Sequence, residues 1–108
     1  MDKQILVNEA IGKLRQDLSS RGFVVGEHRT IPRYIGFRPF PVELGLVMPD
    51  AQWSSLKEKV HYLGQRKRAV LTDDEQFIVG AILVYPTADA MNEDMDERLG
   101  MHLAVSDW

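Results

Sequence analysis

The sequence predicts a small α+β domain in which a mostly antiparallel sheet is packed by two or three helices. Apolar residues recur at helical spacing in residues 3–20 and again after residue 50. Short β-type runs bounded by glycine and proline lie between and after these helical segments. The chain has 108 residues, of which 44% are apolar and 27% charged, the size and composition of one globular domain. We therefore expect residues 1–108 to form a single domain.

The N-terminal half is expected to hold one helix and two or three strands. Residues 3–20 form an amphipathic helical pattern, and Gly22 is a natural stop. Residues 23–25 form a short β-type run. Residues 42–48 predict a strand with alternate apolar side chains on one face, and Gly45 within it indicates a bulge or a close backbone approach.

The proline-rich stretch between these strands limits what it can form. Three prolines within residues 29–41 exclude a helix and any long central strand. We expect at most a short edge strand around residues 34–37.

A second helix is expected to begin at Asp50, its N-cap, and to end at Gly64, its C′ residue. Four apolar residues share one stripe of this helix, and we expect them to pack in the core: Trp53, Leu56, Val60 and Leu63.

The segment from residue 69 to residue 85 fits two structures. Thr72 and Glu75 match a capping box, which favours a helix from about residue 73. The apolar run of residues 77–85 consists mainly of strand formers and favours a buried strand. We favour a hairpin in which residues 69–71 pair with this strand across an acidic turn, and a helix within residues 73–85 is the alternative.

The C-terminal residues predict an acidic helix followed by a strand. Residues 88–99 carry Met91, Met95 and Leu99 on one line, and Gly100 is expected to stop the helix. Residues 101–105 then alternate like a final strand. The expected order is therefore α-β-β(-β)-α-β-β-α-β.

This element order is similar to that of the class I type III secretion chaperones. Those proteins are small, acidic, dimeric adaptors, and the resemblance lies in the order of elements rather than in a sequence motif. It implies an adaptor or chaperone-like role for this chain.

The charge is unevenly distributed along the chain. Residues 1–68 carry twelve Lys and Arg against seven Asp and Glu, a net charge of +5, whereas residues 69–108 carry one Arg against nine acids, a net charge of −8. Because basic and acidic surfaces attract each other, this asymmetry favours association. A homodimer is the expected form.

Several functional classes lack their sequence signatures. The chain has no cysteine, which excludes disulfides, thiolate metal sites and cysteine nucleophiles. Its first residues form no apolar leader, and its longest apolar run, residues 77–85, is too short to span a membrane. We therefore expect a cytoplasmic protein.

Cofactor and metal motifs are also missing from the sequence. The glycines form no nucleotide-binding loop, and residues 89–97 lack the glycine and glutamate positions of a calcium loop. His28, His61 and His102 show no metal-ligand spacing. We expect no cofactor and no enzymatic activity, the alternative being an enzyme whose site is assembled only in the fold.

Arginines and aromatic residues alternate in the proline-stiffened segment of residues 29–41. Such side chains dominate the energy of protein interfaces, because they offer a large contact area and planar hydrogen bonding. The alternative is that the aromatics cap the core while the arginines face solvent. The candidate contact residues are Arg29, Arg33, Tyr34, Phe37, Arg38 and Phe40.

A second basic cluster follows the second predicted helix and consists of Arg66, Lys67 and Arg68. Basic residues near aromatics are typical of nucleic-acid binders. A solvated helix end gives the same pattern. The sequence therefore predicts a small non-enzymatic protein-binding module, as an adaptor, chaperone-like or inhibitor protein. The alternative is a nucleic-acid-binding module that uses both basic clusters.

Overall fold

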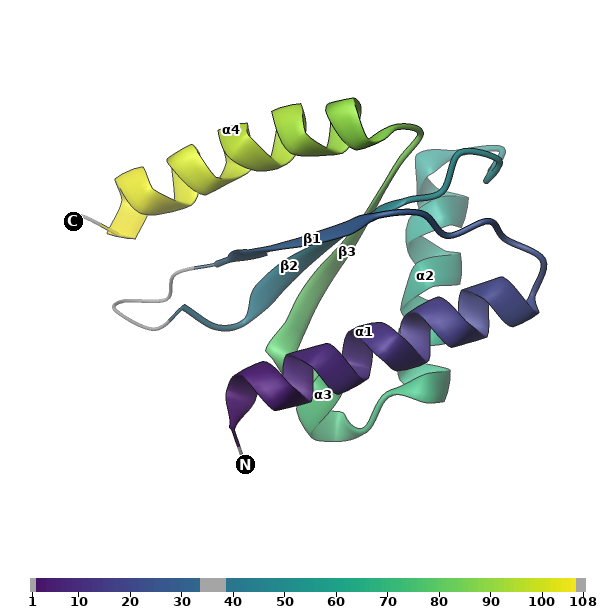
Figure 1. The fold of residues 1–108 in the computed structure, drawn as a ribbon, viewed down its shortest axis with the longest axis horizontal. Helices are drawn as coiled ribbons and strands as arrows, with labels where there is room; N and C mark the ends of the chain where they lie inside the picture. The colour runs from purple at the N-terminus through teal and green to yellow at the C-terminus, as the bar shows by residue number, and fades with distance from the viewer. Residues whose placement is uncertain (1, 34–38, 107–108) are drawn as a thin grey trace.

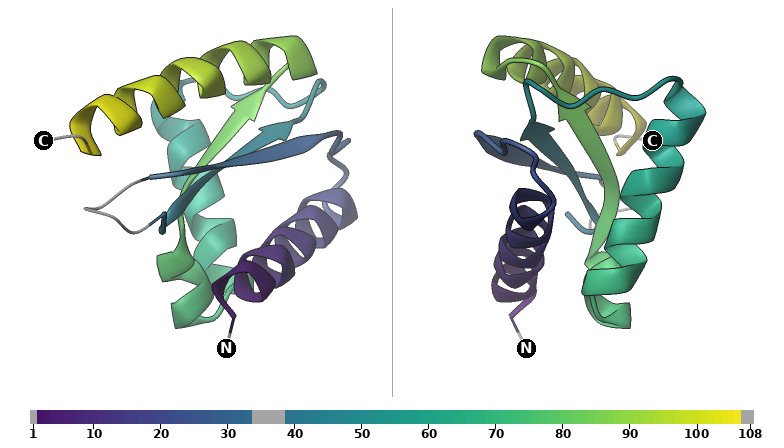
Figure 2. Two further views of the ribbon diagram at one scale, coloured as in Figure 1. Left: turned by 60° about the vertical axis from the view of Figure 1, so that its left-hand side comes forward. Right: turned by 90° about the vertical axis from the view of Figure 1, so that its right-hand side faces the viewer.

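A three-stranded sheet lies between two layers of helices in the computed structural model, which describes residues 2–33 and 39–106. Helix α4 (Ala88–Ser106) crosses one face of the sheet (Figure 1). Helices α1 (Lys3–Ser20), α2 (Leu56–Val70) and α3 (Asp73–Ile78) lie on the other side (Figure 2). The α+β class predicted from the sequence is confirmed.

The sheet is mixed rather than mostly antiparallel, which corrects the prediction. Strand β1 (His28–Pro32) pairs antiparallel with β2 (Val42–Val47), and β2 pairs parallel with β3 (Val79–Tyr85). Helices α2 and α3 form the crossover between β2 and β3, and such a crossover returns the chain in the same direction. Strand β2 is central, so β3 is an edge strand.

Strand β2 is buried along its whole length because it has helices on both faces. Leu44 and Leu46 pack in the larger core with the apolar side of α1. On the opposite face, Gly45 lies directly under Met91 and Met95 of α4. The close backbone approach predicted at Gly45 is therefore confirmed.

Helix α1 has the predicted bounds. The side chain of Asp2 caps it by accepting a hydrogen bond from the Gln4 N–H at 2.8 Å. Gly22 ends the segment with a φ of 92°, a conformation that favours glycine. The buried side of the helix consists of Val7, Ala10, Ile11, Leu14 and Leu18.

Helix α2 begins later and ends later than predicted. Ser55, not Asp50, is its N-cap, because the Ser55 side chain accepts a hydrogen bond from the Glu58 N–H at 3.1 Å. Gly64 lies inside the helix, since its φ is not positive and it forms no C′ turn.

The predicted core stripe of this helix is wrong at two of its four positions. Leu63 is buried, and Trp53, which precedes the helix, is half-buried against Phe23. Leu56 and Val60 are 72% and 62% exposed. They lie beside the outer edge of the sheet, so no neighbouring element of the described chain covers them.

The two leucines of α2 should therefore respond differently to truncation. We expect Leu63→Ala to lower the free energy of unfolding by about 2 kcal/mol, because it removes buried side-chain contacts. Leu56→Ala should cost less than about 0.5 kcal/mol, as exposed substitutions usually do. Urea unfolding of both variants measures the difference, and equal losses would contradict the placement of the helix.

Residues 73–85 combine both structures that the sequence allowed. Helix α3 has a complete capping box, in which the Thr72 hydroxyl accepts from the Glu75 N–H at 3.2 Å and Glu75 Oε1 accepts from the Thr72 N–H at 2.9 Å. Strand β3 follows at once. The favoured hairpin is wrong, because residues 69–71 end α2 rather than pair with β3.

Two further strands predicted from the sequence are absent from the described residues. Residues 23–25 form a loop in which Phe23 packs on Trp53 and Tyr62, with ring centroids 6.0 and 5.7 Å apart. Residues 101–105 continue α4 past Gly100, held there by His102 against Glu43 of β2. The strand predicted around residues 34–37 lies outside the described residues.

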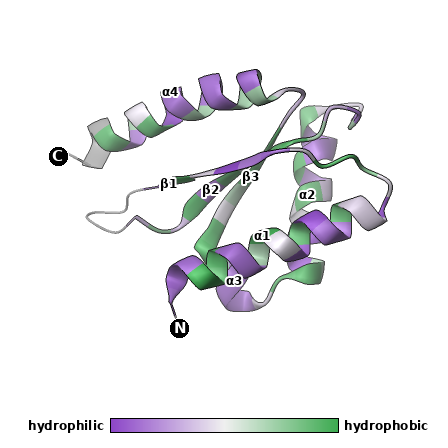
Figure 3. Cartoon of the chain, viewed as in Figure 1, coloured by the Kyte–Doolittle hydropathy of each residue, from purple (hydrophilic) through white to green (hydrophobic). Residues whose placement is uncertain are grey.

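The observed order, α-β-β-α-α-β-α, therefore departs from the order on which the resemblance to type III secretion chaperones was based. Helix α4 places its hydrophilic residues mostly on the side turned away from the sheet (Figure 3). In the described part of the chain, no helix combines the length and apolarity needed to cross a bilayer.

Candidate functional site

The described arginines of the segment 29–41 have different surroundings. Arg29 on β1 donates to Asp96 of α4 at 2.6 Å and to the Asn92 side chain at 3.3 Å. Arg33 follows β1 and is exposed. Arg29 therefore helps to hold α4 on the sheet, and Arg33 has a side chain that a partner can reach.

The aromatic residues of this segment are described only in part. Phe40 is half-buried against the larger core, and the ammonium of Lys3 lies 5.6 Å from its ring centroid. Phe40 thus packs against the core and is not a freely exposed contact residue. Tyr34, Phe37 and Arg38 lie outside the described residues.

The basic cluster at residues 66–68 points in several directions. Arg66 forms two hydrogen bonds of 2.8 Å with the carboxylate of Asp17 on α1, and this contact lowers the pKa of Asp17. Lys67 donates to the Gly80 carbonyl of β3 at 3.0 Å. Arg68 is exposed. The structure does not bring the three together as one basic patch.

Sequence reasoning missed a groove between α2 and the outer edge of β3. Two adjoining hollows of about 460 and 340 Å³ lie there. Val60 and Leu63 of α2 and Ile82 and Leu83 of β3 line both of them. The groove therefore has an apolar floor that runs along the free edge of the sheet.

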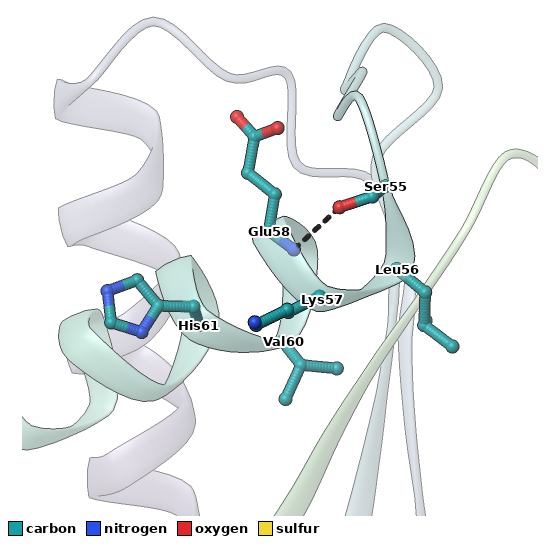
Figure 4. Close-up of a pocket in the computed structure, with 6 residues that line it drawn as sticks. All are labelled: Ser55, Leu56, Lys57, Glu58, Val60 and His61. Atoms are coloured by element: carbon teal, nitrogen blue, oxygen red, sulfur yellow. Dashed lines mark hydrogen bonds between the residues drawn. The ribbon is translucent and has the colours of Figure 1, made fainter.

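The groove opens onto the exposed start of α2. A shallow hollow there is lined mainly by apolar atoms of residues 55–61. Figure 4 shows the side chains of Leu56 and Val60 projecting from the helix, with the hydrogen bond from the Glu58 N–H to Ser55 at its first turn. The two exposed apolar side chains thus continue the apolar floor outward.

The backbone of β3 presents unused hydrogen-bonding groups to this groove. The Tyr85 carbonyl accepts from the Met48 N–H at 2.9 Å, so Tyr85 points toward β2. Backbone groups alternate in direction along a strand, so Ile82 and Val84 point away from β2. Gly80 lies where the register shifts, and its carbonyl faces Lys67 of α2. Within the described chain, no group bonds the N–H or the carbonyl of Ile82.

Two lysines of α2 cover part of this open edge. Lys67 donates to the Gly80 carbonyl at 3.0 Å, and Lys59 donates to the Val84 carbonyl at 3.4 Å. Burial lowers the pKa of Lys67, because removing the ammonium from water disfavours its charged form. Lysines at an exposed sheet edge discourage unwanted strand pairing.

The rim of the groove is basic. Lys57, Lys59, Lys67 and Arg68 lie around it, and Glu58 is the acidic residue among them. Glu58 is held by Ser54, whose hydrogen bonds lower the pKa of the Glu58 carboxyl. At the end of the groove near α4, Asp94 and Arg98 form an ion pair in which Arg98 Nε lies 2.9 Å from Asp94 Oδ2, so their charges cancel. The rim as a whole therefore favours an anionic partner.

A polar cluster closes α4 onto the sheet beside the groove. Tyr85 donates to Asp94, and burial together with this bond raises the pKa of Tyr85 to about 12. In the same cluster, the side chain of Glu43 on β2 is buried. Its Oε1 lies 2.9 Å from His102 Nε2, and its Oε2 lies 3.5 Å from Arg98 Nη1. Acidic and basic groups are paired here, so the cluster fastens the helix.

The three histidines do not converge. His28 Nδ1 lies 3.4 Å from Arg15 Nη1. Burial, and to a smaller extent the positive charge of Arg15, lowers the pKa of His28. His61 is exposed on α2, and His102 contacts Glu43. Among the described residues, no group of three or more His, Asp and Glu side chains is arranged to hold a metal ion.

Comparisons with protein-family models, with curated proteins and with solved structures find no match to this chain.

Proposed function

We propose that this chain is a protein-binding module that engages its partner through the groove between α2 and β3. One observation carries the proposal: exposed Leu56 and Val60 lie beside an apolar groove and an unpaired strand edge. Contiguous apolar surface next to open backbone groups is costly to leave exposed and is typical of protein-interaction sites. An adaptor, chaperone-like or inhibitor role fits such a surface.

Arg68 on the rim of the groove, and Arg33 outside it, can add contacts. Both side chains are exposed, and arginine is frequent in the energetically dominant parts of interfaces. Their role is supporting rather than central in this proposal, because neither lines the apolar floor shared by the two hollows.

Nucleic-acid binding has less support. Arg29 and Arg66 are engaged with Asp96 and Asp17 within the chain, so their guanidinium groups are not free for phosphates. Salt titration of binding to generic duplex DNA and single-stranded RNA tests this alternative. Phosphate neutralisation would give a steep loss of affinity with salt, and we expect binding too weak to define such a slope.

A single substitution should test the groove. We expect Val60→Glu to leave the fold intact, because Val60 is 62% exposed, and to weaken partner binding by at least about tenfold by placing a charge on the apolar floor. Gln65→Glu is the matched control, since it adds the same charge at an exposed position of α2 outside the groove.

Affinity capture from the source cells with wild type and both variants provides the measurement. The proposal requires proteins that are retained by wild type and by Gln65→Glu and lost with Val60→Glu. Equal capture by all three proteins would place the binding surface elsewhere.

A further inference from the structure

We infer that the partner enters this groove as an extended acidic segment, which adds a fourth strand to the free edge of β3. The inference rests on the proposed function and specifies the form and charge of the partner. It follows from three properties of the groove: the direction of the β3 backbone groups, the position of two lysines and the apolar floor on α2.

The backbone of β3 favours an extended partner over a helical one. Ile82 and Val84 direct their N–H and carbonyl groups out of the sheet, and the Gly80 carbonyl faces Lys67 of α2. An added strand satisfies these groups through its own main chain, which a helix cannot do because its backbone groups bond to each other. Strand addition therefore uses a feature of the groove that helix docking would leave unsatisfied.

The lysines favour acidic residues in that segment. A strand added to β3 takes over the carbonyls of Gly80 and Val84, which now accept from Lys67 and Lys59. The displaced ammonium groups then need new acceptors near the same edge. Gly80 and Val84 are four residues apart, about 13 Å along a strand. Carboxylates at a similar spacing on the partner would meet both lysines.

The floor of the groove determines which other side chains the partner segment should carry. Successive residues of a strand point to opposite faces of the sheet. One set of partner side chains would thus face α2, where an apolar side chain would meet Val60 and Leu63, and the acidic side chains on either side of it would meet Lys59 and Lys67. The other set would face the α4 side, near Asp94 and Arg98, where polar groups fit. The expected partner segment therefore carries two acidic residues four positions apart, with an apolar residue midway between them.

A second copy of this chain is a poorer occupant. A two-fold dimer places the same surface of both copies together, so Lys59 and Lys67 of one copy would face the same lysines of the other. Like charges at such close range oppose association. The acidic residues of α4 do not solve this problem, because α4 is a helix and offers no edge backbone.

Selection from a random peptide library displayed on phage, with the intact chain as bait, tests the inference. We expect the enriched peptides to carry two acidic residues four positions apart with an apolar residue midway between them, and to lose binding to Val60→Glu. On binding, the amide protons of Ile82 and Val84 should become protected from hydrogen exchange. The amide of Leu83, which already points to β2, serves as the internal reference.

Charge dependence gives a second measurement. Replacing the acidic residues of the best peptide by Gln should weaken binding to wild type by at least about tenfold. The double variant Lys59→Gln and Lys67→Gln should bind both peptides equally. Lys57→Gln is the matched control, because Lys57 is exposed and contacts no β3 carbonyl within the described structure, so it should keep the preference for the acidic peptide.

Three outcomes would overturn the inference. Peptides with helical spacing that still depend on Val60 would reject strand addition and leave the proposed function standing. A library without binders, or with binders insensitive to Val60→Glu, would reject the peptide site, and the capture experiment would then decide the proposed function separately. Sedimentation showing a dimer that Val60→Glu dissociates would make a second copy the occupant.

Discussion

Replacing Gly45 by Val should detach α4 from the sheet and lower the free energy of unfolding by about 3 kcal/mol. A Cβ atom at Gly45 would overlap Met95 Sδ and lie 3.1 Å from Met91 Cγ. Both methionines are buried, and a branched side chain needs more room than they can yield. Urea unfolding gives the stability, and hydrogen exchange in residues 88–103 reports the position of α4.

Two glycine variants separate this clash from a general effect of adding a side chain. Gly45→Ala should cost less than Gly45→Val, because a flexible methionine can move away from a single methyl group. Gly80→Ala should change stability little, since a Cβ there would meet only Pro41 and the Val42 carbonyl at 3.5 Å or more. Equal losses for Gly45→Ala and Gly45→Val would show that α4 is not seated on this glycine.

The helical periodicities that are local in the sequence were predicted well. Helix α1 has the predicted bounds because its apolar stripe and the glycine that follows it agree, and in the structure Asp2 adds a cap at its start. Helix α2 was misplaced because Asp50 and Gly64 carry cap-forming residue types while Ser55 makes the cap. Residue type shows where a cap is possible, whereas the hydrogen bond that forms depends on the path of the incoming chain.

The segment around β3 shows the same limit. The capping box at Thr72 predicts a helix correctly, and the β-branched residues after it predict a strand correctly. The change from helix to strand between Ile78 and Val79 could not be located, because each pattern alone fits a longer segment. Pairing of β3 with β2 then depends on a contact across more than thirty residues.

The candidate site could not be read from the sequence for a different reason. An apolar stripe such as Leu56, Val60 and Leu63 looks the same whether it faces a core or an open groove. Lys59 and Lys67 are eight residues apart on α2 and lie near the side of Val60 and Leu63, which is the one local signal of an exposed margin. The pairing of Arg66 with Asp17 could not be predicted either, because the two residues are 49 positions apart in the chain.

Glu75→Ala should lower the free energy of unfolding by about 3 kcal/mol at neutral pH. The Glu75 side chain is 1% exposed, accepts from Lys13 Nζ at 2.7 Å and closes the capping box with Thr72. Losing the cap costs about 1 kcal/mol, and losing a charged hydrogen bond of a buried group costs about 2 kcal/mol. Lys13→Ala is the matched control and should cost less, because Glu75 keeps its bond to Thr72.

The stability supplied by Glu75 should also depend on pH. Burial would raise the pKa of Glu75, but the bonds from Lys13 and Thr72 outweigh it, so the folded-state pKa lies below the ordinary value of 4.5. The charged form of Glu75 is thus favoured by folding. Its contribution to stability is complete above about pH 4.5 and is lost as pH falls through the lower folded-state pKa.

The variant Glu75→Gln keeps the shape of the side chain and an acceptor oxygen but carries no charge. Wild type should therefore be more stable than Glu75→Gln at pH 7, and the difference in stability should shrink on acidification below about pH 4.5. Asp17 and Asp94 titrate alike in both proteins, so their effect cancels in this difference. Urea unfolding of the two proteins from pH 7 to pH 3 measures this difference, and a gap that stays constant would mean that the Lys13 contact does not hold Glu75 in its charged form.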